Sequence, residues 1–360
     1  MTTLSAFSDA EAERAKLYLA TTVAAMMGRK FEEDDWAKVY AAAKGFTASA
    51  WSNFDVDVMQ GNLGVEHKMI GRSGGGSLLE CCGRSIMHPA GTRAIRFPRN
   101  LTDPNAAARD VLRQYGRKIE ERSLIVRLIN RYHHSESSRD QAIVELTALG
   151  MGRDKALELV PADRTPRGSP WDEPDMRFGW FIWRRDLAEF LYFEKPMVAP
   201  DPSEFFGEWH ERRTSGRRLP SRNLWIFRHS TGSKEYSITT DAGSKVQPYF
   251  TVPPPRDPNL YHFRVQGETT DDGLVRVWLT YETAQALRSN VLDTSPAALS
   301  KFVRERSVRT LDANAPARSA FEPPAVQFLI SRDAYTALRA DHDAVSDEHA
   351  FRLLLNESAD

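Results

Sequence analysis

The segment from Asn53 to Ile70 constrains the fold more than any other part of the chain, because its pattern is typical of a β-hairpin. Before the turn, apolar residues alternate with Asp55 and Asp57, which places apolar side chains on one face and carboxylates on the other. Gln60-Gly61-Asn62 has the composition of a tight turn. A turn at this point places Asp57 opposite Glu66 in the return strand.

The return strand also carries Lys68, which shares a face with Glu66 because side chains alternate along a strand. With the turn near Gly61, Asp55 lies opposite Lys68. Directly opposed residues have Cβ atoms about 4.5–5.5 Å apart. The sequence therefore predicts a compact cluster of carboxylates and one ammonium. His67 points to the other face, where we expect a packed or hydrogen-bonded histidine rather than a ligand.

Such a cluster suits the hydrolysis of a phosphodiester. Paired carboxylates can hold a hard divalent cation. The cation polarises the phosphodiester and lowers the pKa of a bound water, and an ammonium beside it orients that water or stabilises developing charge. We therefore expect Asp57 and Glu66 to bind metal, with Asp55 as the competitor of Asp57, and Lys68 to act on the water. The alternative is a solvated strand face with cross-strand charge pairs.

Asp57 (or Asp55) followed by Glu66-His67-Lys68 resembles the acidic–X–Glu-X-Lys signature of the PD-(D/E)XK nuclease superfamily, and within it the type II restriction endonucleases. The proline of the family name is absent, because Asn53-Phe54 precedes Asp55. The resemblance covers roughly residues 9–130. It implies a Mg²⁺-dependent endonuclease of a restriction system, acting on specific sites in double-stranded DNA and commonly working as a homodimer.

Several arginines are candidates for DNA contact. The densest basic run spans residues 212–222, where glycine and proline disfavour regular structure. Arginine matches guanine and phosphate through two hydrogen bonds, so this run predicts a DNA clamp or base reader, with a solvated loop as the equal alternative. A strand expected over residues 92–97 would add another arginine near the substrate. The predicted DNA-binding residues are Arg93, Arg212, Arg213, Arg217, Arg218 and Arg222.

A long helix is expected to begin at Asp103-Pro104, since Asp is a good cap and Pro is allowed at the first helical position. Arg109, Arg113 and Arg117 are spaced to line one side of it. Either they form a solvated face or they contact a phosphate backbone.

Charge and composition limit the alternatives. The chain has 48 basic and 49 acidic side chains, so any nucleic-acid surface must be a local patch. Its two cysteines, Cys81 and Cys82, are adjacent and form no disulfide framework. No run is long and apolar enough to span a membrane, and the N-terminus has no export signal, so we expect a cytoplasmic protein.

The order of the expected elements predicts an α/β fold with a mixed sheet flanked by helices. Helices over residues 8–27 and 34–44 precede the hairpin. A catalytic core with a helical insert would occupy residues 1–160, and the proline-rich segment 161–178 would be a linker. Residues 179–360 would form a β-rich DNA-recognition region, with hairpins over residues 180–193, 224–238 and 261–279.

Two other functions remain open. In one, the protein is a non-catalytic DNA-binding or regulatory protein that uses the loop Arg212–Arg222, and the acidic hairpin is plain surface. In the other, it is a structural or interaction protein built on the β-rich half. A zinc hydrolase, a serine hydrolase and a P-loop enzyme are disfavoured, because the sequence lacks their metal-ligand, nucleophile-elbow and Walker motifs.

Overall fold

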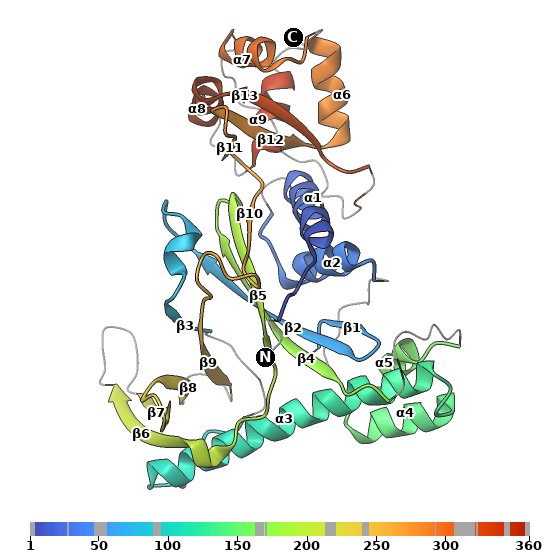
Figure 1. Ribbon diagram of the computed structural model, residues 1–360, viewed down its shortest axis with the longest axis vertical. Coiled ribbons are helices and arrows are strands. Elements are labelled where there is room, and N and C mark those ends of the chain that lie inside the picture. Colours follow the sequence, from blue (N-terminus) through green and yellow to red (C-terminus); the bar gives the residue numbers. More distant parts are fainter. Residues whose placement is uncertain are drawn as a thin grey trace.

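The computed structural model describes residues 4–26, 29–46, 56–88, 95–162, 169, 171–212, 221–239, 245–291, 293–305, 321, 323–341 and 346–356. Over these ranges the chain forms nine α-helices and three β-sheets, so the predicted mixed α/β class is confirmed (Figure 1). In the part of the chain that the structure describes, no helix has both the length and the apolar composition of a membrane span.

Five strands form the central sheet, in the order β1 (Val58–Gln60), β2 (Leu63–Arg72), β4 (Asp175–Arg184), β5 (Glu189–Pro196) and β10 (Tyr261–Arg264). Strands β2 and β4 run parallel, and the other neighbours are antiparallel. Parallel strands need a long connection. Here it contains α3 (Pro104–His133), a helix of 30 residues. The sheet is therefore mixed, as predicted.

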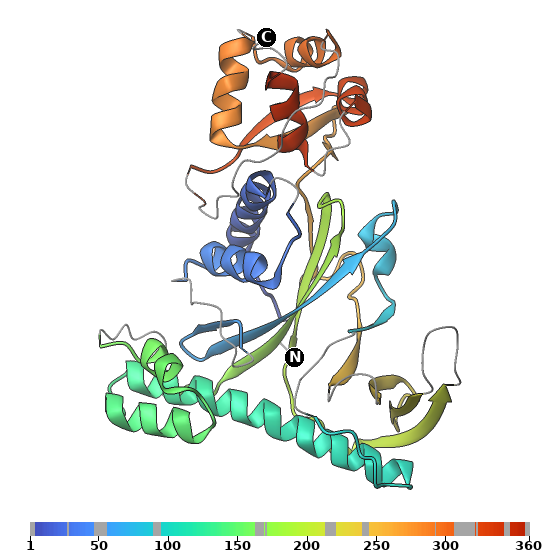
Figure 2. The ribbon, with the colours of Figure 1, turned by 180° about the vertical axis from the view of Figure 1, so that it is seen from behind.

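Helices pack on both faces of this sheet. On one face, α1 (Asp9–Ala25) and α2 (Glu33–Lys44) bury apolar side chains such as Trp36 against Phe181 of β4. On the other face, α3 packs with Trp180. Trp180 directly precedes Phe181 in β4, so its side chain points to the opposite face of the sheet. Figures 1 and 2 show α1 and α2 on one side of the β1–β2 hairpin and α3 on the other.

Local signals explain where these helices begin and end. Ser8 forms a capping box with Glu11 at the start of α1. Asp103 caps α3, with Pro104 as its first residue. Helix α2 ends at Gly45, whose φ of 70° is the left-handed conformation that glycine adopts most easily. All three helices, predicted over residues 8–27 and 34–44 and from Asp103-Pro104 onward, are confirmed.

A second, antiparallel sheet packs on α3. Its order is β3 (Ser85–Met87), β9 (Val246–Thr251), β8 (Lys234–Thr239), β7 (Ser221–Arg228) and β6 (Phe205–Arg212). The backbone of Gly207 in β6 donates to the side chain of Asn105 in α3, at 3.0 Å. Trp180 of the central sheet stacks on Phe250 of β9, with ring centroids 3.8 Å apart. One hydrophobic core thus joins both sheets and α3.

The C-terminal part forms a third unit with its own core, in which Val277 and Phe351 are fully buried. Its strands and helices are β11 (Glu268–Thr269), β12 (Leu274–Leu279), α6 (Tyr281–Asn290), α7 (Pro296–Glu305), β13 (Val326–Ser331), α8 (Arg332–Asp341) and α9 (Asp347–Asn356). The remaining elements of the chain are η1 (Leu78–Cys81), α4 (Arg139–Ala148), α5 (Arg153–Leu159) and η2 (Pro202–Glu204).

Four sequence expectations need revision. The hairpin over residues 261–279 is wrong, because β10 pairs with β5, whereas β12 pairs with β11 and β13. Ile95–Phe97, the described end of another expected strand, lie outside any strand. The segment 161–178 does not separate two sheets, since β4 begins at Asp175 and pairs with β2 along its whole length. The β-rich half also ends in four helices, α6 to α9.

Candidate active site

The register of the β1–β2 hairpin brings Asp57 and Glu66 together. Val58 pairs with Val65, and one further step along the same register places Asp57 opposite Glu66, as the sequence predicted. Asp57 itself lies in a bend just before β1. The predicted alternation stops at this bend, because Val56 and Val58 pack into different hydrophobic cores. Asp55 lies outside the described residues, so its pairing with Lys68 stays a prediction.

The carboxylate of Asp57 is fixed by the backbone of β2. The N–H of His67 donates to Asp57 Oδ2 at 2.5 Å, and the Asp57 N–H donates to the carbonyl of Val65 at 3.0 Å. Asp57 is only 9% exposed. The side chain is therefore held in one orientation beside the strand that carries Glu66.

Glu66 and Lys68 lie on the same face of β2 and touch each other. The Nζ of Lys68 donates to Glu66 Oε1, and both residues are buried. The second oxygen, Oε2 of Glu66, is buried and has no hydrogen-bond partner among the described residues. Buried carboxylate oxygens are normally satisfied, so this one is available to a ligand.

Arg122 of α3 completes the cluster and was not predicted as a site residue. It is 2% exposed, and its guanidinium lies 3.9 Å from Glu66 Oε1 and 3.9 Å from the sulfur of Met197. A sequence signal exists, since Arg122 falls on the apolar stripe of α3, three residues after Ile119 and four before Val126. An arginine at a core position of an amphipathic helix needs a buried partner, which here is Glu66.

The electrostatics of the cluster oppose two ionised carboxylates. Burial, followed by the charge of Glu66, raises the pKa of Asp57 well above its usual range. Burial disfavours the ammonium of Lys68, but the charges of Glu66 and Asp57 outweigh this effect and raise the pKa of Lys68. Glu33, at the first position of α2, adds to both shifts. It is a further nearby carboxylate that the sequence reasoning missed.

The donor set fits a divalent cation that keeps much of its own water. Asp57 and Glu66 offer carboxylate oxygens, which Mg²⁺ prefers, and the unused Oε2 of Glu66 gives it a free ligand. Among the described residues, no group of three or more histidine, cysteine, aspartate or glutamate side chains is arranged to hold a metal. Water and substrate phosphate would therefore supply the other ligands, as is usual for Mg²⁺.

His67 faces away from this cluster, as expected. Its ring is fully buried, and its Nε2 lies 3.2 Å from the hydroxyl of Tyr192. Burial lowers the pKa of His67 to about 3, so the imidazole is neutral at ordinary pH. His67 is therefore a hydrogen-bonded core residue and not a member of the carboxylate cluster.

Of the predicted DNA-binding arginines, only the side chain of Arg222 lies within the described residues. Arg222 is in β7 of the second sheet, where its guanidinium lies 3.7 Å from the centroid of the Trp209 ring. Arg212 ends β6, but its side chain is outside the described set. Arg93, Arg213, Arg217 and Arg218 also lie outside the described residues.

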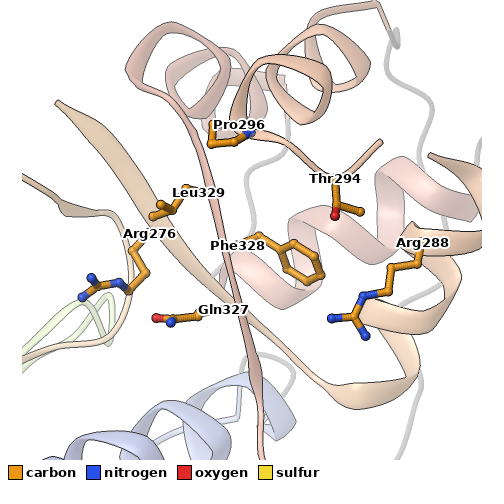
Figure 3. Close-up of a pocket in the computed structure, with 7 residues that line it drawn as sticks. All are labelled: Arg276, Arg288, Thr294, Pro296, Gln327, Phe328 and Leu329. Atoms are coloured by element: carbon orange, nitrogen blue, oxygen red, sulfur yellow. The ribbon is translucent and has the colours of Figure 1, made fainter. Parts of the chain in front are cut away.

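Two cavities lie away from the cluster. Arg113 and Arg117 line one of about 350 Å³ between α3 and the segment Ala199–Pro202. The other, of about 320 Å³, is in the C-terminal unit (Figure 3). Its two arginines are already engaged, since Arg276 pairs with Glu268 at 2.6 Å and Arg288 lies over the Phe328 ring. The first is also lined by Asp110 and Glu120, but neither cavity is lined by Asp57, Glu66 or Lys68.

No protein-family model, no curated protein and no solved structure matches this chain. The site must therefore be judged by its own geometry.

Proposed function

We propose that the protein is a Mg²⁺-dependent endonuclease that hydrolyses phosphodiester bonds in double-stranded DNA, as a sequence-specific restriction enzyme that works as a homodimer. The observation that carries the proposal is the convergence of Asp57, Glu66 and Lys68 at one point of the β1–β2 hairpin, with an unused oxygen on Glu66. The resemblance to the PD-(D/E)XK signature supports the same conclusion.

In this proposal, each side chain of the cluster has a distinct task. Asp57 and Glu66 hold the metal through their carboxylate oxygens. A Mg²⁺ ion at this place would polarise the phosphodiester and lower the pKa of a bound water. The Nζ of Lys68 positions that water or stabilises negative charge in the transition state. Arg122 compensates the buried charge of Glu66 from the side of α3.

One observation favours the alternative of a DNA-binding protein without nuclease activity. Asp57, Glu66 and Lys68 are each less than a tenth exposed, as in a structural ion-pair cluster. In that case DNA would bind elsewhere, with the arginines of residues 212–222 as the candidates. Cleavage of DNA separates the two functions.

The direct test is the conversion of supercoiled plasmid to nicked and linear forms by the full chain. We expect cleavage with Mg²⁺ or Mn²⁺, none with EDTA, and loss of cleavage in Glu66→Gln. Glu268→Gln is the matched control, because Glu268 also accepts from a lysine but lies in the C-terminal unit. Failure of the wild type to cut any mixed-sequence DNA with either metal would reject the nuclease function.

The arginine loop is tested separately by the salt dependence of DNA binding. Each phosphate contact that is lost reduces the slope of log affinity against log salt by about 0.9. We expect a flatter slope when Arg212, Arg213, Arg217 and Arg218 are all replaced by Ala. An unchanged slope would assign the loop to solvent.

A further inference from the structure

A chain of buried polar side chains crosses three strands on the face of the sheet opposite the carboxylate cluster. His67 of β2 contacts the hydroxyl of Tyr192 in β5. That hydroxyl donates to Glu194 Oε1 at 2.8 Å, and Arg177 of β4 donates to Glu194 Oε2 at 2.8 Å. His67 and Glu194 have no exposed surface. The proposed chemistry gives these residues no direct role. Burying polar and charged side chains costs free energy unless they are hydrogen-bonded, as they are here.

The hydrogen bonds of this chain have a definite direction. Glu194 accepts from both Tyr192 and Arg177, so it acts as a carboxylate. Tyr192 has one hydroxyl proton and gives it to Glu194, so its oxygen must accept from His67. His67 is therefore protonated at Nε2. Every link depends on the next, and removal of one leaves a buried group without its partner.

Gly179 of β4 shows how closely the chain is packed. It lies directly beside His67 in the parallel β2–β4 register. A Cβ at this position would be 2.5 Å from Cδ2 of His67 and 2.5 Å from the hydroxyl of Tyr192. The contact between the imidazole and the phenol therefore requires glycine here.

His67 links this chain to the carboxylate cluster through its own backbone. Its side chain is held by Tyr192 on one face, while its N–H donates to Asp57 Oδ2 at 2.5 Å. Its neighbours in sequence, Glu66 and Lys68, project to the face of the cluster. A shift of β2 at this residue would move all three cluster side chains at once.

We propose that the chain His67–Tyr192–Glu194–Arg177 is the positioning network of the metal site, which fixes the spacing between the carboxylates of Asp57 and Glu66. This inference rests on the proposed nuclease function. Hydrogen bonds outside the ligand shell orient metal ligands, and their loss typically weakens metal affinity or activity by about 10–100-fold. Their side chains lie on the face of the sheet opposite Asp57, Glu66 and Lys68, so in this proposal they act only through β2.

The test uses Tyr192→Phe in the full chain, which removes one hydroxyl and keeps the ring. We expect Mn²⁺ affinity, measured by calorimetry, to fall by about 10–100-fold, and kcat for plasmid cleavage to fall while KM for DNA stays unchanged. Tyr132→Phe is the matched control, because it also loses a hydroxyl bond, to the carbonyl of Pro161, near the end of α3. It should leave both quantities unchanged.

A second pair of variants separates positioning from general damage. His67→Ala should show the same loss as Tyr192→Phe. His67→Gln should restore most of the Mn²⁺ affinity, because the amide nitrogen of Gln can donate to Tyr192 as Nε2 does. Hydrogen–deuterium exchange of residues 64–69 without metal should be faster in Tyr192→Phe than in the wild type or in Tyr132→Phe.

The outcomes are distinguishable. A wild type that binds Mn²⁺ and cuts DNA, with Tyr192→Phe equal to it in affinity and in exchange, would overturn the positioning network and leave the nuclease function standing. A wild type that neither binds Mn²⁺ nor cuts DNA would overturn the function, and the positioning network with it.

Discussion

Two buried glutamates in the central sheet differ in how their oxygens are used. Glu194 of β5 is fully buried, and both of its oxygens accept hydrogen bonds, from Tyr192 and Arg177. Glu66 of β2 is 4% exposed, but in the described part of the chain only its Oε1 accepts, from Lys68, and Oε2 has no hydrogen-bond partner. The two residues are on opposite faces of the same sheet.

Under the proposed function, this difference separates a buried charge that stabilises the fold from one that binds a ligand. A carboxylate whose two oxygens both accept hydrogen bonds has less to offer a metal than one with an unused oxygen. Glu66 has an unused oxygen and lies beside Asp57, whose ionised form is disfavoured by burial and by the charge of Glu66. Such a pair of carboxylates gains most from a cation. Burial of charge alone would not have identified the site.

The largest effect, on the free energy of unfolding, should come from removing a partner of Glu194, the glutamate with both oxygens bonded. Arg177→Met removes the cation that holds Glu194, and loss of one partner of a buried pair typically costs about 3–5 kcal/mol. Arg122→Met should lower the free energy of unfolding less, since Lys68 still holds Glu66. Urea unfolding of both variants measures this. Equal losses would show that the two glutamates do not differ.

Removal of the lysine from the other glutamate should affect catalysis more than binding. We expect Lys68→Ala to lower the DNA cleavage rate by about 10²–10³, as for other groups that stabilise transition-state charge, with DNA binding in Ca²⁺ largely intact. Plasmid cleavage and gel shift are the assays. Lys16→Ala is the control, because Lys16 also pairs with a glutamate, Glu268, but away from the cluster. Cleavage by Lys68→Ala at the wild-type rate would remove the hairpin from the mechanism.

The sequence predicted the cluster as far as local rules reach. The turn at Gly61 and the two-residue period of strands place Asp57, Glu66 and Lys68 together, because a hairpin of this length has few registers. The bend at Asp57 was missed, since it depends on the bond from the His67 N–H to the Asp57 carboxylate. The helix cap at Asp103 is also a local feature and was predicted.

Contacts between distant segments were not predictable in the same way. Tyr192 meets His67 across 125 positions, and this requires the strand order β2-β4-β5. Arg122 reaches Glu66 only because α3 crosses that face of the sheet. The wrong pairing of residues 261–279 has the same origin, since alternation identifies a strand but not its partner.

The smallest of the expected effects concerns the metal itself and tests the comparison most directly. Mn²⁺ should raise the melting temperature of the wild type, because a ligand that binds only the folded state, present at 100 times its Kd, adds about 2.7 kcal/mol.

Since burial and Glu66 raise the pKa of Asp57, its ionisation opposes folding, and stability falls as pH rises from the unfolded pKa of about 3.9 through the raised folded value. Asp57→Asn should therefore be more stable than the metal-free wild type at neutral pH, yet show no shift with Mn²⁺. Differential scanning fluorimetry at several pH values, with and without Mn²⁺, measures both effects. A variant that melts lower than the metal-free wild type and keeps the metal shift would mean that Asp57 is a structural acceptor for His67 and that the cation binds elsewhere.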